Sequence, residues 1–367
     1  GEMATLPSPD AWTVVQPHPQ RPLCSAHRPA NHRCHSLPCS TSSRLRSSSI
    51  RNSITPPLSS KIPRPLTRPP PASMSSPSFE VNASSGTGAR EEELGNERPR
   101  LLGENDLLIV GPGVLGRLVA KTWREEHPGC QIFGQTLTAD HHDELIQMGI
   151  TPFPKGPKTV HQFPYIIFCA PPSRSPDYPG DVRLAASSWS GEGSFLFTSS
   201  SATYDCNDNG TCDEDSPIVP IGRSARADVL LKAEKTALEF GGCVLRLAGL
   251  YNANRGAHVY WLEKGNVDVR PDHILNLIHY EDAATLSVAI LKKKLHGRVF
   301  LGCDDHPLSR QEVMELTSRS GKFSKNFGSF TGSDGPLGKR LNNRKTRKEI
   351  KWEPKYPSFS HFLGMLD

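Results

Sequence analysis

The stretch DLLIVGPGVLGRLVAKTWR, residues 106–124, decides the fold. Its apolar run Leu107–Val110 is short and stops at a glycine, which predicts a buried β-strand. Apolar residues then recur at helical spacing from Leu115 to Thr122, which predicts an α-helix directly after a tight turn.

The turn between strand and helix, Gly111–Gly116, reads G-x-G-x-x-G. In a dinucleotide-binding unit the first glycine makes the turn, the second lets a diphosphate lie against the backbone, and the third lets the helix pack close to the strand. The helix N-terminus then favours the anion. We therefore predict cofactor contacts at Gly111, Gly113, Val114, Leu115 and Gly116. The alternative is an empty strand-to-helix turn.

The next predicted strand, residues 131–135, should lead to the position that selects the cofactor ribose. It ends in Gln135-Thr136-Leu137-Thr138, with no carboxylate to bond a 2′-hydroxyl and no arginine to pair a 2′-phosphate. The missing carboxylate weakly favours NADP over NAD, and Thr136 can donate to either sugar. His141 and His142 could assist a phosphate, although a solvated helix start explains them as well.

Two further buried strands follow, at Tyr165–Ala170 and Ser194–Thr198, and the first is stopped by Pro171. A strand that ends in small residues beside the first strand is where the nicotinamide-side ribose passes, so Ala170 and Pro171 are predicted cofactor contacts. The alternation of strands and helices predicts an α/β sheet with right-handed crossovers.

The segment before the predicted domain has a different composition. Residues 11–79 contain no Asp or Glu and are rich in Arg, Ser and Pro, which predicts disorder and is typical of an organelle transit peptide. A disordered regulatory tail, or sequence read through upstream of a later start such as Met74, would also fit. We expect residues 1–104 to be leader and linker, and residues 105–367 to be the folded domain.

The formal net charge of +5 comes largely from this leader, so the folded part is near neutral and a nucleic-acid partner has little support. The sequence contains no run of 18 apolar residues, so no membrane span is predicted. The six cysteines outside the leader are scattered, mostly inside apolar strands, which suits buried thiols in a reducing compartment.

Five segments together resemble the extended short-chain dehydrogenase/reductases, the NAD-dependent epimerase/dehydratase group. They are the glycine turn, FTSSSATY at 197–204, CVLRLAGLY at 243–251, NLIHYEDAA at 276–284 and GKRLNN at 338–343. The resemblance implies a Rossmann-type doubly wound parallel sheet with a small C-terminal substrate lobe, NAD or NADP as cofactor, and a nucleotide-sugar substrate. With the leader, it suggests a plant-type, organelle-targeted member, in a chloroplast or other plastid, with mitochondrion or cytoplasm as alternatives.

Catalysis in that group needs a Ser or Thr, a Tyr, and a Lys four residues after the Tyr. Ser200 falls at the serine position, but Arg226 stands where the Tyr belongs and Leu230 where the Lys belongs. Arginine cannot act as a general acid near neutral pH, and Lys232 faces about 200° away on a helix of roughly 3.6 residues per turn. The departure resembles what are called atypical members of the group.

Substitutes for the missing pair are few. Tyr204 could reach the site and supply a proton, or it could simply pack at the edge of the sheet. Arg226 suits binding of phosphate or carboxylate, and His279 is a second candidate for substrate binding or for ordering a loop of the lobe. The basic stretch Lys339–Lys351 is interpreted as a solvated surface.

A metal site is not predicted. Asp205–Gly210 matches the opening of a calcium loop, but Ser216 stands at the twelfth position where a bidentate Glu is required, so a polar turn explains it better. Cys206 and Cys212 could form a disulfide or half a zinc site, yet no second pair lies at ligand spacing.

Two functions follow from these patterns. One is an NAD(P)-binding protein without turnover, whose bound cofactor stabilises or switches a surface that a partner uses. The other is an oxidoreductase or epimerase acting on a small polar substrate through Ser200 and Tyr204.

Overall fold

The computed structural model describes residues 102–156 and 161–365. The predicted leader falls almost entirely on residues 1–101, outside the described residues. Leu102, inside the predicted linker, already packs against the apolar core.

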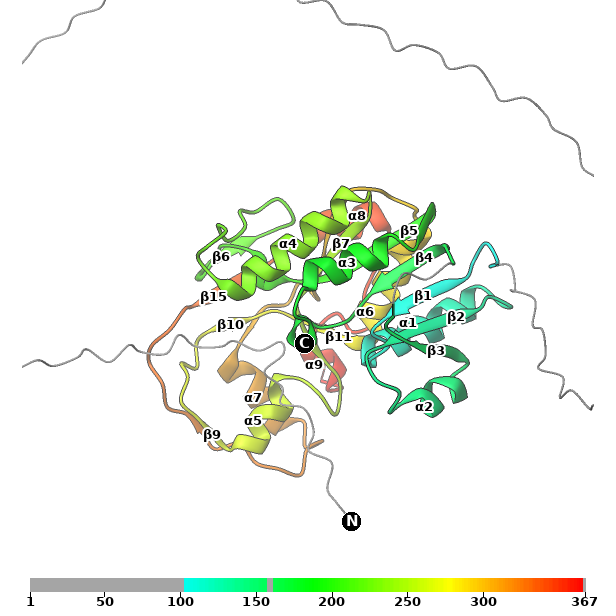
Figure 1. The fold of residues 1–367 in the computed structure, drawn as a ribbon. Helices are drawn as coiled ribbons and strands as arrows, with labels where there is room; N and C mark the ends of the chain where they lie inside the picture. The colour runs from blue at the N-terminus through cyan, green and yellow to red at the C-terminus, as the bar shows by residue number, and fades with distance from the viewer. Residues whose placement is uncertain (1–101, 157–160, 366–367) are drawn as a thin grey trace, which may run out of the picture. The chain divides into compact units, whose positions relative to one another are not determined.

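The centre of the described part is a seven-stranded sheet in the order β12-β7-β5-β4-β1-β2-β3, and every neighbouring pair in it is parallel (Figure 1). Its strands are β1 (Leu107–Val110), β2 (Ile132–Thr136), β3 (Ile150–Pro154), β4 (Phe163–Phe168), β5 (Trp189–Ser200), β7 (Cys243–Leu247) and β12 (Val299–Gly302). This confirms the predicted Rossmann-type sheet. The strand order reverses between β1 and β4, where such sheets bind ligands.

Helices cover both faces of this sheet because alternate side chains of each strand point to opposite sides. Leu107 and Ile109 face a cluster that includes α1 (Val114–Glu126) and α6 (Tyr280–Lys292). Leu108 and Val110 face the opposite cluster, which contains residues of α3 (Tyr178–Ala186) and α4 (Ala225–Glu239). Figure 1 shows α3 and α4 together on one side of the strands.

A smaller lobe has its own apolar cluster, formed around Tyr251, Trp261, Met314 and Phe359. Its elements are α5 (Ala257–Lys264), β9 (Asn266–Val267), β13 (Leu308–Ser309), α7 (Arg310–Arg319), β14 (Ser329–Phe330) and α9 (Phe359–Phe362) (Figure 1). This is the predicted C-terminal lobe.

A second sheet, in the order β13-β10-β15-β6, links this lobe to the loop after β5. It contains β6 (Asp208–Cys212), β10 (Ile274–Leu275) and β15 (Gly338–Leu341). The remaining elements are α2 (His142–Gln147), η2 (Pro172–Arg174), η3 (Ser201–Thr203), β8 (Gly249–Tyr251), β11 (Leu277–His279) and α8 (Arg344–Ile350).

None of the helices in the described ranges combines the length and the apolar character that a membrane crossing requires.

Candidate functional site

The carboxyl ends of β1, β2, β4, β5 and β7 open onto one cleft of about 1520 Å³. Its other wall comes from the first turns of α4 and α5 and from β10 and β15. The cleft therefore lies at the strand-order reversal, between the sheet and the lobe. Such a position is typical of cofactor and substrate sites in open α/β sheets.

The three glycines of the turn differ in what surrounds them. Gly111 has φ +79°, and a Cβ there would lie 2.6 Å from the Cα of Ala170, so only glycine fits. A Cβ on Gly116 would lie 2.8 Å from Ile109 Cγ2, which is the close packing of helix on strand predicted for this position. At Gly113 a Cβ would meet no heavy atom of the described residues within 4 Å.

Gly113 is also the N-cap of α1. Within the described part, no side chain caps this N-terminus and the first turn carries no acidic residue. Gly113, Val114 and Leu115 all line the cleft. The exposed backbone and the positive end of the helix dipole together make a suitable place for a diphosphate.

Charged side chains from neighbouring helices lie beside the end of β2, which the sequence did not indicate. Thr136 lines the cleft and its hydroxyl is bonded to His142 Nε2 at 2.8 Å. Beside it, Arg117 Nη1 donates to Glu144 Oε2 at 2.8 Å, and this bond lowers the pKa of Glu144. The end of β2 itself carries neither a carboxylate nor a guanidinium, but α1 supplies Arg117 and α2 supplies Glu144 beside it. This pair could not be read from the sequence because its members are 27 residues apart.

At the end of β4, Ala170 and Pro171 line the cleft as placed from the sequence. Ala170 O accepts a 2.7 Å hydrogen bond from the Tyr178 hydroxyl, which fixes the strand end against α3. The contact of Gly111 with Ala170 brings the ends of β1 and β4 together. The cofactor roles of Thr136, Ala170 and Pro171 stay predictions.

Ser200 closes β5 and lines the cleft, with its Oγ accepting from Ala202 N at 3.1 Å. Its hydroxyl proton is left to donate. The neighbouring Ser199 points the other way and donates to Glu234 Oε1 at 2.6 Å. Glu234 is in turn held by Arg246, with Nη2 to Oε2 at 2.7 Å. The buried ion pair therefore anchors the end of β5, and this positions Ser200.

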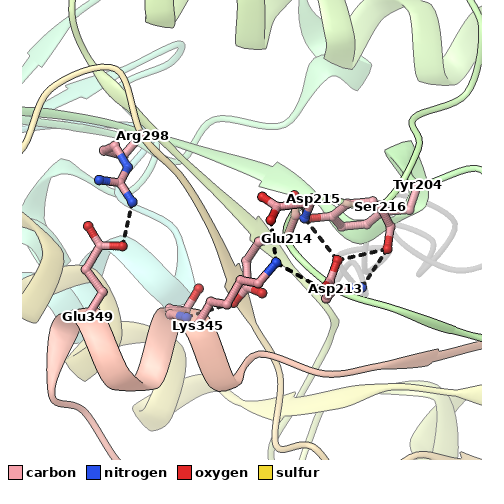
Figure 2. Close-up of polar contacts among 9 residues, drawn as sticks. Tyr204, Asp213, Glu214, Asp215, Ser216, Arg298, Lys345 and Glu349 are labelled. Carbon is pink, nitrogen blue, oxygen red and sulfur yellow. Dashed lines mark hydrogen bonds and ion pairs between the residues drawn. The ribbon is translucent and has the colours of Figure 1, made fainter.

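Tyr204 packs in the core and also lines the cleft, and its role as a proton donor stays a prediction. Its side chain is 1 % exposed and its hydroxyl lies 3.4 Å from the backbone oxygen of Glu214, to which it donates. The Arg246 guanidinium lies 4.6 Å from the ring centroid. Burial raises the pKa of Tyr204 to about 12. Figure 2 shows the ring beside the acidic loop 213–216, which Lys345 of α8 contacts through Asp213 and Asp215.

The helix predicted to carry Tyr-x-x-x-Lys is α4. Arg226 lies in the first turn of α4 and lines the cleft, and burial lowers its pKa. Leu230 is 2 % exposed and belongs to the core cluster. Lys232 is exposed, as the helical angle predicted. A core leucine thus replaces the lysine, and Arg226 remains a predicted substrate contact.

His279 is not among the residues that line the cleft, so the prediction of substrate binding is corrected. It is the N-cap of α6, and its Nδ1 accepts from Glu281 N at 3.2 Å. Its ring packs against Tyr251, Tyr356 and Phe362. Burial lowers the pKa of His279 to about 4, so the ring is neutral. The other prediction, that it orders the lobe, describes it correctly.

Lys339 was assigned to a solvated basic stretch, and the structure corrects this. It lines the cleft from β15, and its ammonium donates to Ser201 O at 3.1 Å and to Tyr204 O at 2.7 Å. Burial lowers the pKa of Lys339. This contact could not be read from the sequence because 135 residues separate Lys339 from Tyr204.

The segment Asp205–Gly210, which resembles a calcium loop, enters β6 at Asp208, so only its first residues form the predicted loop. Asp208 Oδ1 accepts from Gly210 N at 3.1 Å and Asn209 has φ +68°. Cys206 and Cys212 are free thiols. Across residues 102–156 and 161–365, no group of three or more Cys, His, Asp or Glu side chains is arranged to hold a metal ion.

Solved structures with the same architecture cover 70% of this chain and nearly all of their own. A conserved protein of unknown function from Silicibacter pomeroyi has 20% identity, a TM-score of 0.58 and 96% of its chain covered. dTDP-glucose 4,6-dehydratase from Bacillus anthracis, solved with NAD, has 15% identity and a TM-score of 0.58, and 94% of its chain is covered. UDP-glucose 4-epimerase from Thermotoga maritima, solved with UDP-glucose, has 15% identity and a TM-score of 0.55, and 96% of its chain is covered. The fold is that of these epimerases and dehydratases.

At these identities the likeness establishes the fold alone. No protein-family model matches the sequence, and no curated protein matches it significantly.

Proposed function

We propose that the cleft binds a nicotinamide dinucleotide, NAD or NADP, and that the protein is an NAD(P)-binding, atypical member of the epimerase/dehydratase group. Gly113 carries this proposal. A glycine that could hold a side chain without a clash, at the uncapped start of a helix and facing a cleft, is explained by a ligand that needs bare backbone. The dehydratase that shares the fold was solved with NAD.

The other two glycines do not carry the proposal, because the fold itself explains them. Gly111 and Gly116 would be required in a turn that binds nothing, given their contacts with Ala170 and Ile109. Gly113 has φ −78° and ψ −154°, an extended conformation that alanine also adopts. Packing alone therefore gives no reason for a glycine at this position.

Calorimetry with NAD⁺, NADH, NADP⁺ and NADPH tests the proposal on the full chain and on Gly113→Ala. We expect the wild type to bind at least one of the four. Gly113→Ala should lower that affinity at least about tenfold, equivalent to about 1.4 kcal/mol, and leave the melting temperature unchanged. The matched control is Gly156→Ala, an exposed glycine outside the cleft whose Cβ would meet only Pro154 O at 4.0 Å.

Two results would refute the proposal. One is a wild type with no affinity for any of the four dinucleotides. The other is a Gly113→Ala protein that binds as tightly as the wild type, because the methyl group would occupy the space that the diphosphate needs.

A second function, an oxidoreductase or epimerase on a small polar or nucleotide-sugar substrate, is supported by Ser200. Ser200 is 8% exposed and lines the cleft, and its hydroxyl is oriented by a hydrogen bond from Ala202 N. Such a hydroxyl can polarise a carbonyl. Sugar nucleotides, quinones and aldehydes are to be screened for cofactor turnover. Turnover that Ser200→Ala abolishes establishes the enzyme, whereas tight cofactor binding without turnover supports the binding protein.

The destination of the chain is a separate proposal. The acid-poor, Arg- and Ser-rich composition of residues 11–79 supports import into a chloroplast or another organelle. Residues 1–104 fused to a fluorescent protein should direct it to the organelle, and an uncleaved fusion in the cytosol would contradict targeting.

A further inference from the structure

Lys339 is held in place by β10 and by Asn276, which directly follows that strand. Gly338 before it has φ +83°, and a Cβ there would lie 2.3 Å from Ile274 O, so β15 runs tightly against β10. The Asn276 side chain then donates to Lys339 O at 2.8 Å and accepts from Leu341 N at 2.8 Å. Such a clamp fixes the backbone from which the lysine side chain enters the cleft.

Among the described residues, the ammonium group of Lys339 donates hydrogen bonds to backbone oxygens but forms no ion pair with a carboxylate. Its two acceptors, Ser201 O and Tyr204 O, are neutral carbonyls on either side of η3, the turn that follows Ser200. Among the residues that the structure describes, no ion pair of Lys339 is found within 4.0 Å. The nearby Asp205 is already paired with Arg223 at 2.5 Å.

A half-buried cation of this kind is unusual, because burial disfavours a charge without a partner. An ammonium has three donors, and the two carbonyls use two of them. The same wall of the cleft also carries Arg226 and Arg255. Together these positive groups suit a ligand that brings its own negative charge.

We propose that Lys339, together with Ser200, forms a subsite for an anionic oxygen, a carboxylate or phosphate, of the second ligand that the cleft takes beside the dinucleotide. The inference rests on the proposed function, because it assigns the part of the cleft that the dinucleotide leaves open. Lys339 would bind the ligand through the third N–H of its ammonium, and Ser200 through its hydroxyl.

Binding of inorganic phosphate and of malonate to the full chain tests the subsite, with and without saturating NAD⁺. Lys339→Gln keeps an NH₂ group for the two carbonyls and removes the charge, so it should weaken binding at least about tenfold. Lys339→Arg keeps the charge and should bind. The matched control is Arg340→Gln, the next residue, which is exposed and outside the cleft and should bind as the wild type does.

A measurement on the wild type guards against misfolding of the variants. In protein with ¹³C-labelled lysine, the Lys339 signal, identified by its loss in Lys339→Gln, should move when the probe is added. Binding should also fall as pH rises through the lowered Lys339 pKa, and Lys339→Arg should show no such fall. The groups that act on the charge of the ammonium are Asp205, Cys206 and Cys212, and the titratable or charged residues His273 and Arg226 line the same cleft.

Each outcome decides a point. Binding of phosphate alone assigns a phosphate-bearing ligand, and binding of malonate alone assigns a carboxylate. A wild type that binds neither probe, or a Lys339→Gln protein that binds them equally well, overturns the subsite. The proposed function is judged separately, by dinucleotide affinity, which Lys339→Gln should retain.

Discussion

Arg246→Leu should destabilise the protein by about 3–5 kcal/mol, the usual effect of removing one partner of a buried ion pair. The side chains of Arg246 and Glu234 are only 7% and 4% exposed, and the pair has two good contacts, Nη2 to Oε2 at 2.7 Å and Nε to Oε1 at 3.1 Å. Without Arg246, the Glu234 carboxylate keeps only the 2.6 Å bond from Ser199. The loss is a large share of a typical stability of about 5–15 kcal/mol.

The double variant Glu234→Leu/Arg246→Leu should recover most of this loss. Leucines of similar bulk avoid the desolvation of both charges, so the pair can be replaced at little cost, apart from about 1 kcal/mol for the Ser199 bond. The double variant should therefore lose much less stability than the sum of the two single losses.

Urea unfolding of the wild type, both single variants and the double variant, followed by circular dichroism and tryptophan fluorescence, gives the coupling energy directly. Single variants that each lose less than about 1 kcal/mol, with additive effects in the double variant, would refute the reasoning. The result matters for function because Ser199 ties this pair to Ser200, the last residue of β5.

Three further outcomes are expected. Gly116→Ala should cost about 1–3 kcal/mol in chemical denaturation, because its Cβ would lie 2.8 Å from Ile109 Cγ2. Burial lowers the pKa of His258 to about 4, so the unfolded chain binds more protons than the folded protein between about pH 6.5 and 4. The free energy of unfolding should therefore fall by up to about 3 kcal/mol as the pH decreases through that window. The His258→Leu variant should lose this part of the pH dependence. Glu144→Gln should raise the NADP⁺ to NAD⁺ affinity ratio in calorimetry, because Arg117 then lacks its carboxylate; an unchanged ratio would exclude this pair from cofactor choice.

The sequence predicted what depends on neighbours along the chain. Leu107–Val110 is a strand with the expected ends, and the glycine turn needs only six consecutive residues. Strand β5 is longer than expected, Trp189–Ser200 against 194–198, because its polar first residues carry no apolar pattern. Local patterns thus gave the sheet and its glycine turn.

The parts of the site that come from distant segments could not be predicted. Tyr204 has the right place in the sequence for a proton donor, but its burial in the core under Arg246 is set by residues far along the chain. Lys339 belongs to a basic run that is solvated elsewhere, and Gly338 and Asn276 turn it into the cleft. Side-chain direction at such positions is set by tertiary contacts, which residue spacing does not encode.

The position of β15 within its sheet has a consequence for biosynthesis. It comes late in the chain, yet it lies between β10 and β6 rather than at an edge. While the polypeptide is emerging from the ribosome, β10 can pair with β13, but its other edge and the edge of β6 have no strand to join until β15 has been translated. A nascent chain stalled before Gly338 would lack the part of the cleft wall that β15 supplies, and it would expose two unpaired strand edges that chaperones could recognise.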